Sequence, residues 1–117
     1  MTGRTVLFLD LVDDPESIAA YEAHHAPGGV PEAVLRSIRD AGIVEMEIHR
    51  SGDRLVMILE TDETFDAAAK AARDRSDAAV VAWEQLMDRF QRALPWASPH
   101  EKWVPAQRIF ALSEQPA

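Results

Sequence analysis

The 117-residue sequence contains no cysteine. Disulfide bonds, thiol nucleophiles and thiolate-held metal sites are therefore excluded, and an intracellular, cytoplasmic location is expected. The sequence also lacks an apolar stretch long enough for a signal peptide or a membrane helix, so no membrane partner is expected. Basic residues are outnumbered by acidic ones, since the chain has 12 Lys and Arg and 20 Asp and Glu. Since nucleic-acid binding needs clustered positive charge, this balance excludes nucleic acid and favours a neutral or polar small ligand.

Sequence motifs for nucleotide binding, for a nucleophile elbow and for zinc binding are absent as well. Glu45, Glu47 and His49 share one side of a predicted strand, but two carboxylates and one imidazole without a further ligand motif give only a weak metal signal. We therefore expect no metal site.

Apolar residues make up 47% of the chain, enough for one core, and residues 1–117 are expected to form a single domain. Residues 5–12 form a short β-branched and aromatic run that predicts a buried strand. Asp14 followed by Pro15 is typical of a helix start, and this helix must end before the Pro-Gly-Gly at 27–29. A second helix is predicted for 31–41, with Gly42 as its left-handed cap.

The second half of the chain predicts two more strands, two helices and a last strand. Residues 43–50 alternate between apolar and polar, residues 51–53 suit a tight hairpin, and residues 54–60 return as an apolar strand. Helices are predicted for 63–73 and from a Ser76 cap to Leu94, and residues 108–112 predict the final strand. Residues 113–117 are expected to be a frayed tail.

This β-α-β-β-α-β order is that of the ferredoxin-like fold, an α+β plan in which helices cover one face of an antiparallel sheet. Several of the predicted strands are apolar on both faces, although helices can cover only one. An uncovered apolar patch of that size is unusual on a monomer, so we expect a homodimer in which two sheets pack face to face.

Tyr21 and His25 are one helical turn apart and share a helix face at the Pro-Gly-Gly break. An imidazole beside a phenol can form the wall of a pocket, or the pair can simply lie on a solvated helix surface. Glu47 lies in the middle of its strand and belongs either to a solvated stripe or to a dimer interior, where it could bind hydroxyl groups. Trp83 falls on the apolar stripe of the last helix, which fits core packing as well as a site.

Taken together, the stretches YEAHHAP at 21–27, VPE at 30–32, the hairpin from Met46 to Glu60 and WEQLM at 83–87 resemble the L-rhamnose mutarotase family. The resemblance runs from the first strand to Leu112. It implies a ferredoxin-like domain that pairs into a dimeric α/β barrel and interconverts the anomers of a 6-deoxy sugar, a monosaccharide such as L-rhamnose or L-fucose, without a cofactor.

By the same resemblance, Tyr21 is a sugar ligand, His25 the proton donor, and Trp83 an aromatic ligand, while a further ligand position falls near Glu47. Glu84 stands where familiar members have a second tryptophan, and is included among the expected substrate-binding residues. Val30 stands where familiar members have another tryptophan, directly before the Pro-Glu pair. The expected site is the barrel interior shared by two subunits, with Tyr21, His25 and Glu47 around its mouth.

Anomer exchange needs an acid at the ring oxygen and a base at the anomeric hydroxyl. We hypothesise that His25 is the acid and that Glu47 or a bound water is the base. Two alternatives stay open at this point. One is a sugar-binding or regulatory module that has lost catalysis, and the other is a cofactor-free monooxygenase of the same fold group.

Overall fold

The computed structural model describes residues 3–117. Its strands are β1 (Gly3–Leu11), β2 (Ile43–Ser51), β3 (Arg54–Thr61) and the two-residue strands β4 (Gln91–Arg92) and β5 (Val104–Pro105). Its helices are α1 (Pro15–His24), α2 (Glu32–Asp40), α3 (Ala67–Arg75) and α4 (Ala78–Asp88), with a 3-10 turn η1 at Leu112–Glu114. Each helical position of the ferredoxin-like plan is thus filled by a pair of helices. No helix among the described residues is both long and apolar enough to cross a bilayer.

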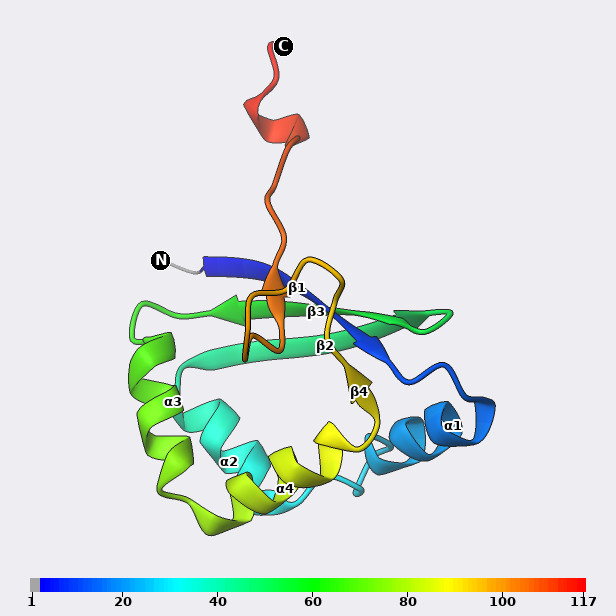
Figure 1. Cartoon of the computed structure of the whole chain (residues 1–117). Helices are drawn as coiled ribbons and strands as arrows, with labels where there is room; N and C mark the ends of the chain where they lie inside the picture. Colours follow the sequence, from blue (N-terminus) through cyan, green and yellow to red (C-terminus); the bar gives the residue numbers. More distant parts are fainter. Residues whose placement is uncertain (1–2) are drawn as a thin grey trace.

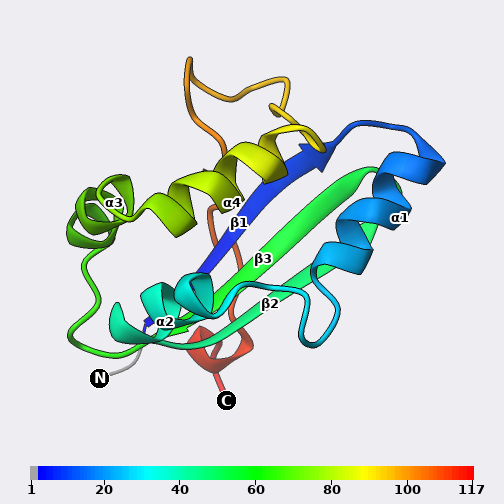
Figure 2. The same cartoon turned by 90° about the horizontal axis from the view of Figure 1, so that it is seen from below.

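The sheet is antiparallel, with strand order β2-β3-β1-β4 and with β5 also paired to β1. All four helices lie against one face of this sheet (Figures 1 and 2). We call the other side of the sheet the open face. The predicted α+β ferredoxin-like fold, with helices on one face only, is confirmed.

In the first half of the chain, the residues predicted to start α1 and to end α2 do so. The Asp14 side chain accepts a hydrogen bond from the Ser17 backbone N–H at 2.8 Å, so α1 begins at Pro15. Gly42 follows α2 with φ of 92°, a conformation that favours glycine, and a Cβ there would collide with the side chain of Asp62. These features fix where the chain turns from α2 into the sheet.

The predicted last helix is wrong at both ends. Ser76 closes α3, and Asp77 caps α4 instead, because its carboxylate accepts from the Ala79 backbone N–H at 3.0 Å. The helix stops at Asp88, because the chain then turns so that Gln91 and Arg92 pair with β1. Residues 89–94 are therefore outside the helix, and Gln91 lies beside the buried end of β1.

The predicted strand at 108–112 is also wrong. The segment that pairs with β1 is Val104–Pro105, after which the chain leaves the sheet and ends in η1. No strand among residues 3–117 lies beside residues 108–112, so their backbone has no partner for a ladder of hydrogen bonds.

Strand register decides which side chains face the helices, because directly opposed residues lie on the same side of a sheet. Met46 opposes Leu59 and Ile48 opposes Met57, and these side chains face the helices. Glu47 opposes Ile58 and therefore faces the open side. The core on the helix side is centred on Leu11, Tyr21, Leu55 and Met87.

Candidate active site

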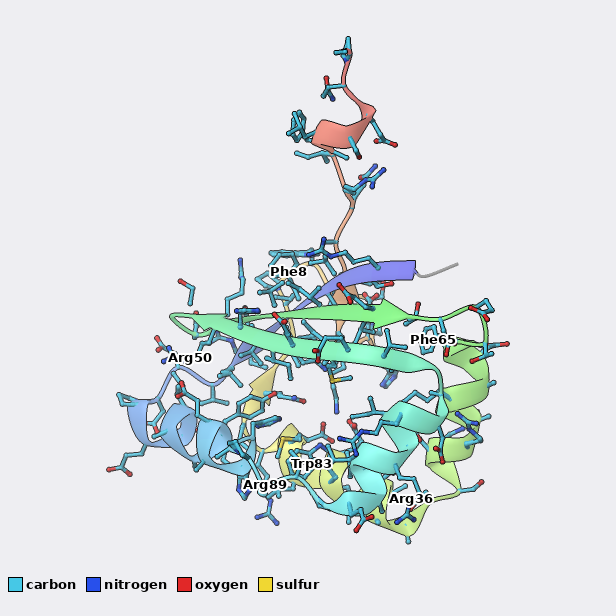
Figure 3. All side chains as sticks on the ribbon, turned by 180° about the vertical axis from the view of Figure 1, so that it is seen from behind. Phe8, Arg36, Arg50, Phe65, Trp83 and Arg89 are labelled. Atoms are coloured by element: carbon cyan, nitrogen blue, oxygen red, sulfur yellow. The ribbon has the colours of Figure 1, made fainter. Side chains whose placement is uncertain are left out.

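A cavity of about 750 Å³ lies between the helices and the sheet. Its floor is apolar and comes from β2 and β3, while all four helices contribute to its walls. Figure 3 shows Trp83, one of the lining residues, on the helix side of the sheet and Phe8 on the opposite side. A mostly apolar cavity with a few polar groups is typical of small-molecule sites.

His25 follows the last turn of α1 and lines this cavity. Its Nδ1 lies 2.7 Å from the carbonyl oxygen of Tyr21. Because a carbonyl can only accept, Nδ1 carries the hydrogen, and Nε2 is left to exchange a proton with a ligand. The imidazole is held between two rings, with centroid distances of 4.3 Å to Tyr21 and 5.3 Å to Trp83.

Tyr21 is buried, with 3% of its surface exposed, and its hydroxyl faces Gln91 of β4, whose amide nitrogen is 3.5 Å away. Burial raises the pKa of the Tyr21 phenol, and the hydrogen bond from Gln91 only partly opposes this effect. The phenol therefore stays protonated and can donate a hydrogen bond.

The amide oxygen of Gln91 is buried without a hydrogen-bond partner among the described residues. Buried polar atoms are nearly always paired, and Gln91 lines the cavity. If the amide were turned over, its nitrogen would be the unpaired atom instead. In either orientation, one end of this amide is available to a ligand hydroxyl.

Glu84 of α4 supplies a carboxylate to the same cavity. One of its oxygens accepts from the Lys102 ammonium at 2.9 Å, and Lys102 also pairs with Asp88 at 2.6 Å. Desolvation alone would lower the pKa of Lys102, but its hydrogen bonds to Asp88 and Glu84 outweigh this and raise the pKa. Lys102 thus remains charged and holds Glu84. Within residues 3–117 the second carboxylate oxygen has no hydrogen-bond partner, so it can bind a ligand.

A second polar cluster lines the cavity where α2 meets α3. Asp74 accepts from Ser37 and from Lys70, each at 2.5 Å. Desolvation opposes ionisation of Asp74, yet these two hydrogen bonds prevail and lower its pKa. Both carboxylate oxygens are used within this cluster, so it joins α2 to α3.

The structure brings together Tyr21, His25, Trp83 and Glu84, and it places Glu47 elsewhere. Glu47 is on the open face, exposed, and bonded to His49 at 2.8 Å. A ligand in the cavity cannot reach Glu47, because the sheet lies between them. The expected arrangement of Tyr21, His25 and Glu47 around one opening is therefore not the arrangement in this chain.

Sequence reasoning missed Gln91 and Lys102 and did not assign Trp103 to the site. Gln91 falls within the predicted last helix, and its exposure to the cavity depends on the turn after Asp88. Lys102 and Trp103 lie in a loop without regular structure, where the only signal was the presence of tryptophan.

Fold and cavity together define a ferredoxin-like domain that can bind a small polar ligand between helices and sheet and exchange protons with it. Residues 4–112 match the model of the L-rhamnose mutarotase family, and the chain belongs to this family. The predicted family is therefore confirmed, and with it the class of enzyme, since mutarotases are isomerases that act on sugar anomers.

Known relatives agree with this assignment. An L-fucose mutarotase from Xanthomonas campestris pv. campestris is 56% identical over 111 residues, which cover 95% of this chain and 89% of the relative. The crystal structure of an L-rhamnose mutarotase from Formosa agariphila has a TM-score of 0.66 at 17% identity, covering 94% of this chain and 98% of that one. Tetracenomycin F2 cyclase from Streptomyces glaucescens, a type-II polyketide cyclase, has a TM-score of 0.61 at 18% identity, covering 93% and 95%. These two structural similarities concern the fold alone.

Proposed function

We propose that this chain interconverts the α and β anomers of a 6-deoxyhexose, with L-fucose preferred over L-rhamnose, by acid and base catalysis without a cofactor. The observation that carries the proposal is the position of His25, whose Nδ1–H is bonded to a carbonyl and whose Nε2 is available in a cavity that also holds the Glu84 carboxylate. The preference for L-fucose rests on the name of the 56% identical relative.

In the proposed reaction, protonated His25 donates from Nε2 to the ring oxygen while Glu84 takes the proton of the anomeric hydroxyl. The bond between the anomeric carbon and the ring oxygen breaks, which gives an aldehyde and a free chain hydroxyl. After the aldehyde rotates, His25 takes back the proton from that hydroxyl and Glu84 returns its proton to the new anomeric oxygen. Every proton is restored, so no other reactant is needed. Glu84 takes the role first given to Glu47, because Glu84 lines the cavity and Glu47 does not.

The remaining lining residues bind and orient the sugar in this proposal. The Tyr21 phenol and the Gln91 amide bond hydroxyl groups, and Trp83 lies against the C–H face of the ring. The apolar floor suits the methyl group of a 6-deoxy sugar. L-Galactose, which carries a hydroxyl at that carbon, should react about 10- to 100-fold less efficiently than L-fucose.

Saturation-transfer NMR measures anomer exchange directly. We expect the wild-type chain to accelerate exchange of L-fucose more than that of L-rhamnose, and His25→Ala to reduce the acceleration by about 10²- to 10⁴-fold. An exchange rate equal to that of the buffer, with sugar binding still detected by tryptophan fluorescence, would instead identify a binding module.

We also propose that the chain works in the cytoplasm as a homodimer. Val6, Phe8, Val56 and Ile58 place a half-buried apolar band on the open face, which none of the described helices α1 to α4 covers. Two copies packed through this face would bury the band. Light scattering after size-exclusion chromatography tests the homodimer, and cell fractionation tests the location.

A further inference from the structure

The floor of the cavity is longer than one sugar ring. On β2 it is formed by Ile43, Met46 and Ile48, because a bulge near the start of the strand adds Ile43 to the side that faces the helices. Ile48 packs against the core cluster that contains Tyr21. Five steps of about 3.3 Å along the strand separate Ile48 from Ile43, so the floor is about 16 Å long. A single pyranose ring beside His25 covers less than half of this length.

The volume of the cavity leads to the same conclusion. Sites of about 300–1,000 Å³ typically enclose ligands of drug size, and this cavity has a volume of about 750 Å³. A 6-deoxyhexose is a single ring with one methyl group and its hydroxyl groups, which is smaller than such ligands. Helices α1 and α3 lie at opposite ends of the sheet (Figures 1 and 2). With the sugar ring at His25, beside α1, the remaining space therefore extends toward α3.

Helix α3 presents small side chains to this space. Ala67 and Ala71 line the cavity, are one helical turn apart and remain exposed, and none of the residues Ala67–Arg75 is buried. Figure 3 shows Phe65, which directly precedes α3, at this end of the sheet, and Trp83 between it and α1. We call the end of the cavity that is lined by Ile38, Ile43, Phe65, Ala67 and Ala71 the α3 compartment.

The α3 compartment favours an apolar ligand group. The polar side chains nearest to it are Ser37, Lys70 and Asp74, and these bond to one another. The pairing of Lys70 with Asp74 balances their charges, so the compartment has no net attraction for an ion. Ile38 and Phe65, in contrast, are only half-buried. Covering such side chains with an apolar group removes apolar surface from water and is favourable.

The proposed reaction determines which part of the sugar points toward the α3 compartment. His25 must reach the ring oxygen and Glu84 the anomeric hydroxyl, so the edge of the ring that carries these two groups faces α1 and α4. In a pyranose, carbon 3 lies across the ring from the ring oxygen, and carbon 4 lies across from the anomeric carbon. The oxygens on carbons 3 and 4 are therefore the sugar atoms that point toward α3.

We propose that the α3 compartment binds an apolar group carried on oxygen 3 or oxygen 4 of the sugar. The substrate class then includes 6-deoxyhexoses with an apolar group linked there as an ether or an ester. This inference rests on the proposed function and extends its substrate class. The anomeric hydroxyl of such a sugar is free, so His25 and Glu84 exchange its protons as they do for the unsubstituted sugar.

Titration calorimetry with the full chain tests binding independently of catalysis. We expect 3-O-benzyl-L-fucose or 4-O-benzyl-L-fucose to bind at least about tenfold more tightly than L-fucose, because the phenyl ring is buried in the α3 compartment. If neither ether binds more tightly than L-fucose, the proposal is wrong. A reducing disaccharide with a second sugar on the same oxygen should bind less tightly than the better ether. The reverse order would show that the compartment takes a polar group, and would also overturn the proposal.

A substitution that fills the α3 compartment locates the binding. Ala71→Trp should weaken binding of the better ether by at least about tenfold and leave the affinity for L-fucose within about twofold of wild type. Ala72→Trp, on the same helix but outside the cavity lining, is the matched control and should leave both affinities within about twofold. If Ala71→Trp fails to fold, Ala67→Phe takes its place with the same expectation. Unchanged binding of the ether in the filled variant would contradict the proposal.

Anomer exchange of the same sugars, measured by saturation-transfer NMR, separates the two proposals. A chain that binds the better ether tightly but accelerates no exchange contradicts the proposed activity and not the α3 compartment. A chain that accelerates exchange of L-fucose but binds neither ether more tightly contradicts the α3 compartment alone.

Discussion

Tyr21 is the only tyrosine of the chain, so ultraviolet difference absorption reports the ionisation of this phenol alone. Burial raises its pKa above the ordinary value of 10.0. We expect the phenolate signal of the folded chain to appear only above pH 10, and Tyr21→Phe to abolish it. The unfolded chain ionises near its ordinary pKa, so folding stability should fall as the pH rises from that value toward the higher folded one. A titration midpoint at or below 10.0 in the folded chain would contradict this account.

Gln91 is predicted to contribute to binding and not to stability. Gln91→Leu removes a buried amide whose oxygen is unpaired, so the melting temperature should stay the same or rise. The variant also loses a hydrogen bond to the sugar, worth about 1 kcal/mol, so the KM for L-fucose should rise roughly fivefold to tenfold. Gln85→Leu, on the exposed side of α4, is the matched control and should change neither quantity. A lower melting temperature with unchanged KM would assign Gln91 a structural role.

Part of the site could be predicted at the level of residues. Tyr21 and His25 are four positions apart in one helix, and that spacing places them side by side wherever the helix lies. Glu47 shows the limit of such reasoning. Alternation along β2 correctly placed Glu45, Glu47 and His49 on the same side of the strand. Which side of the strand faces the helices, however, depends on packing between segments that are distant in the sequence.

The loop between Leu94 and Val104 positions Glu84 from outside the cavity. Lys102→Met removes the ammonium that holds the Glu84 carboxylate, and we expect kcat for L-fucose to fall about tenfold with little change in KM. Lys102→Arg should restore most of the activity. Asp88→Asn is the control, because Asp88 pairs with Lys102 but does not line the cavity. Equal losses in Lys102→Met and Asp88→Asn would point to a general loosening of the loop.

Helix α1 carries both Tyr21 and His25, and its first turn depends on the Asp14 cap. Asp14→Ala should lower the free energy of unfolding by about 1 kcal/mol, as measured by urea denaturation. Asp13→Ala, one position earlier and exposed, should change it by less than about 0.5 kcal/mol. Similar effects of the two substitutions would show that the cap has no special role.

Elements with local signals were predictable, and elements defined by distant partners were not. The start of α1, the Gly42 cap and the hairpin at Gly52 each depend on a few neighbouring residues. The strands β4 and β5 are two residues long, and each exists only because β1 offers an edge at that point. A segment of two residues is too short for its sequence pattern to predict such a pairing.

At the scale of the whole molecule, the strand predicted at 108–112 had the right composition but lacks a partner within its own chain. Apolar residues on both faces of the sheet led to the expectation of a second copy, and the exposed side chains of Ile109, Phe110 and Leu112 add a second, independent reason. The cavity, in contrast, is built by one chain. Loss of the proposed dimer should therefore leave His25, Tyr21 and Glu84 in place.

We propose that catalysis takes place in the cavity on the helix side of the sheet and not on the open face. Anomer exchange of L-fucose, measured by saturation-transfer NMR for Glu84→Gln and Glu47→Gln, distinguishes the two locations. The two substitutions make the same chemical change on opposite sides of the sheet. We predict that Glu84→Gln lowers the exchange rate by about 10²-fold or more and that Glu47→Gln leaves it within about twofold of wild type. Loss of activity in Glu47→Gln, with Glu84→Gln fully active, would contradict the account.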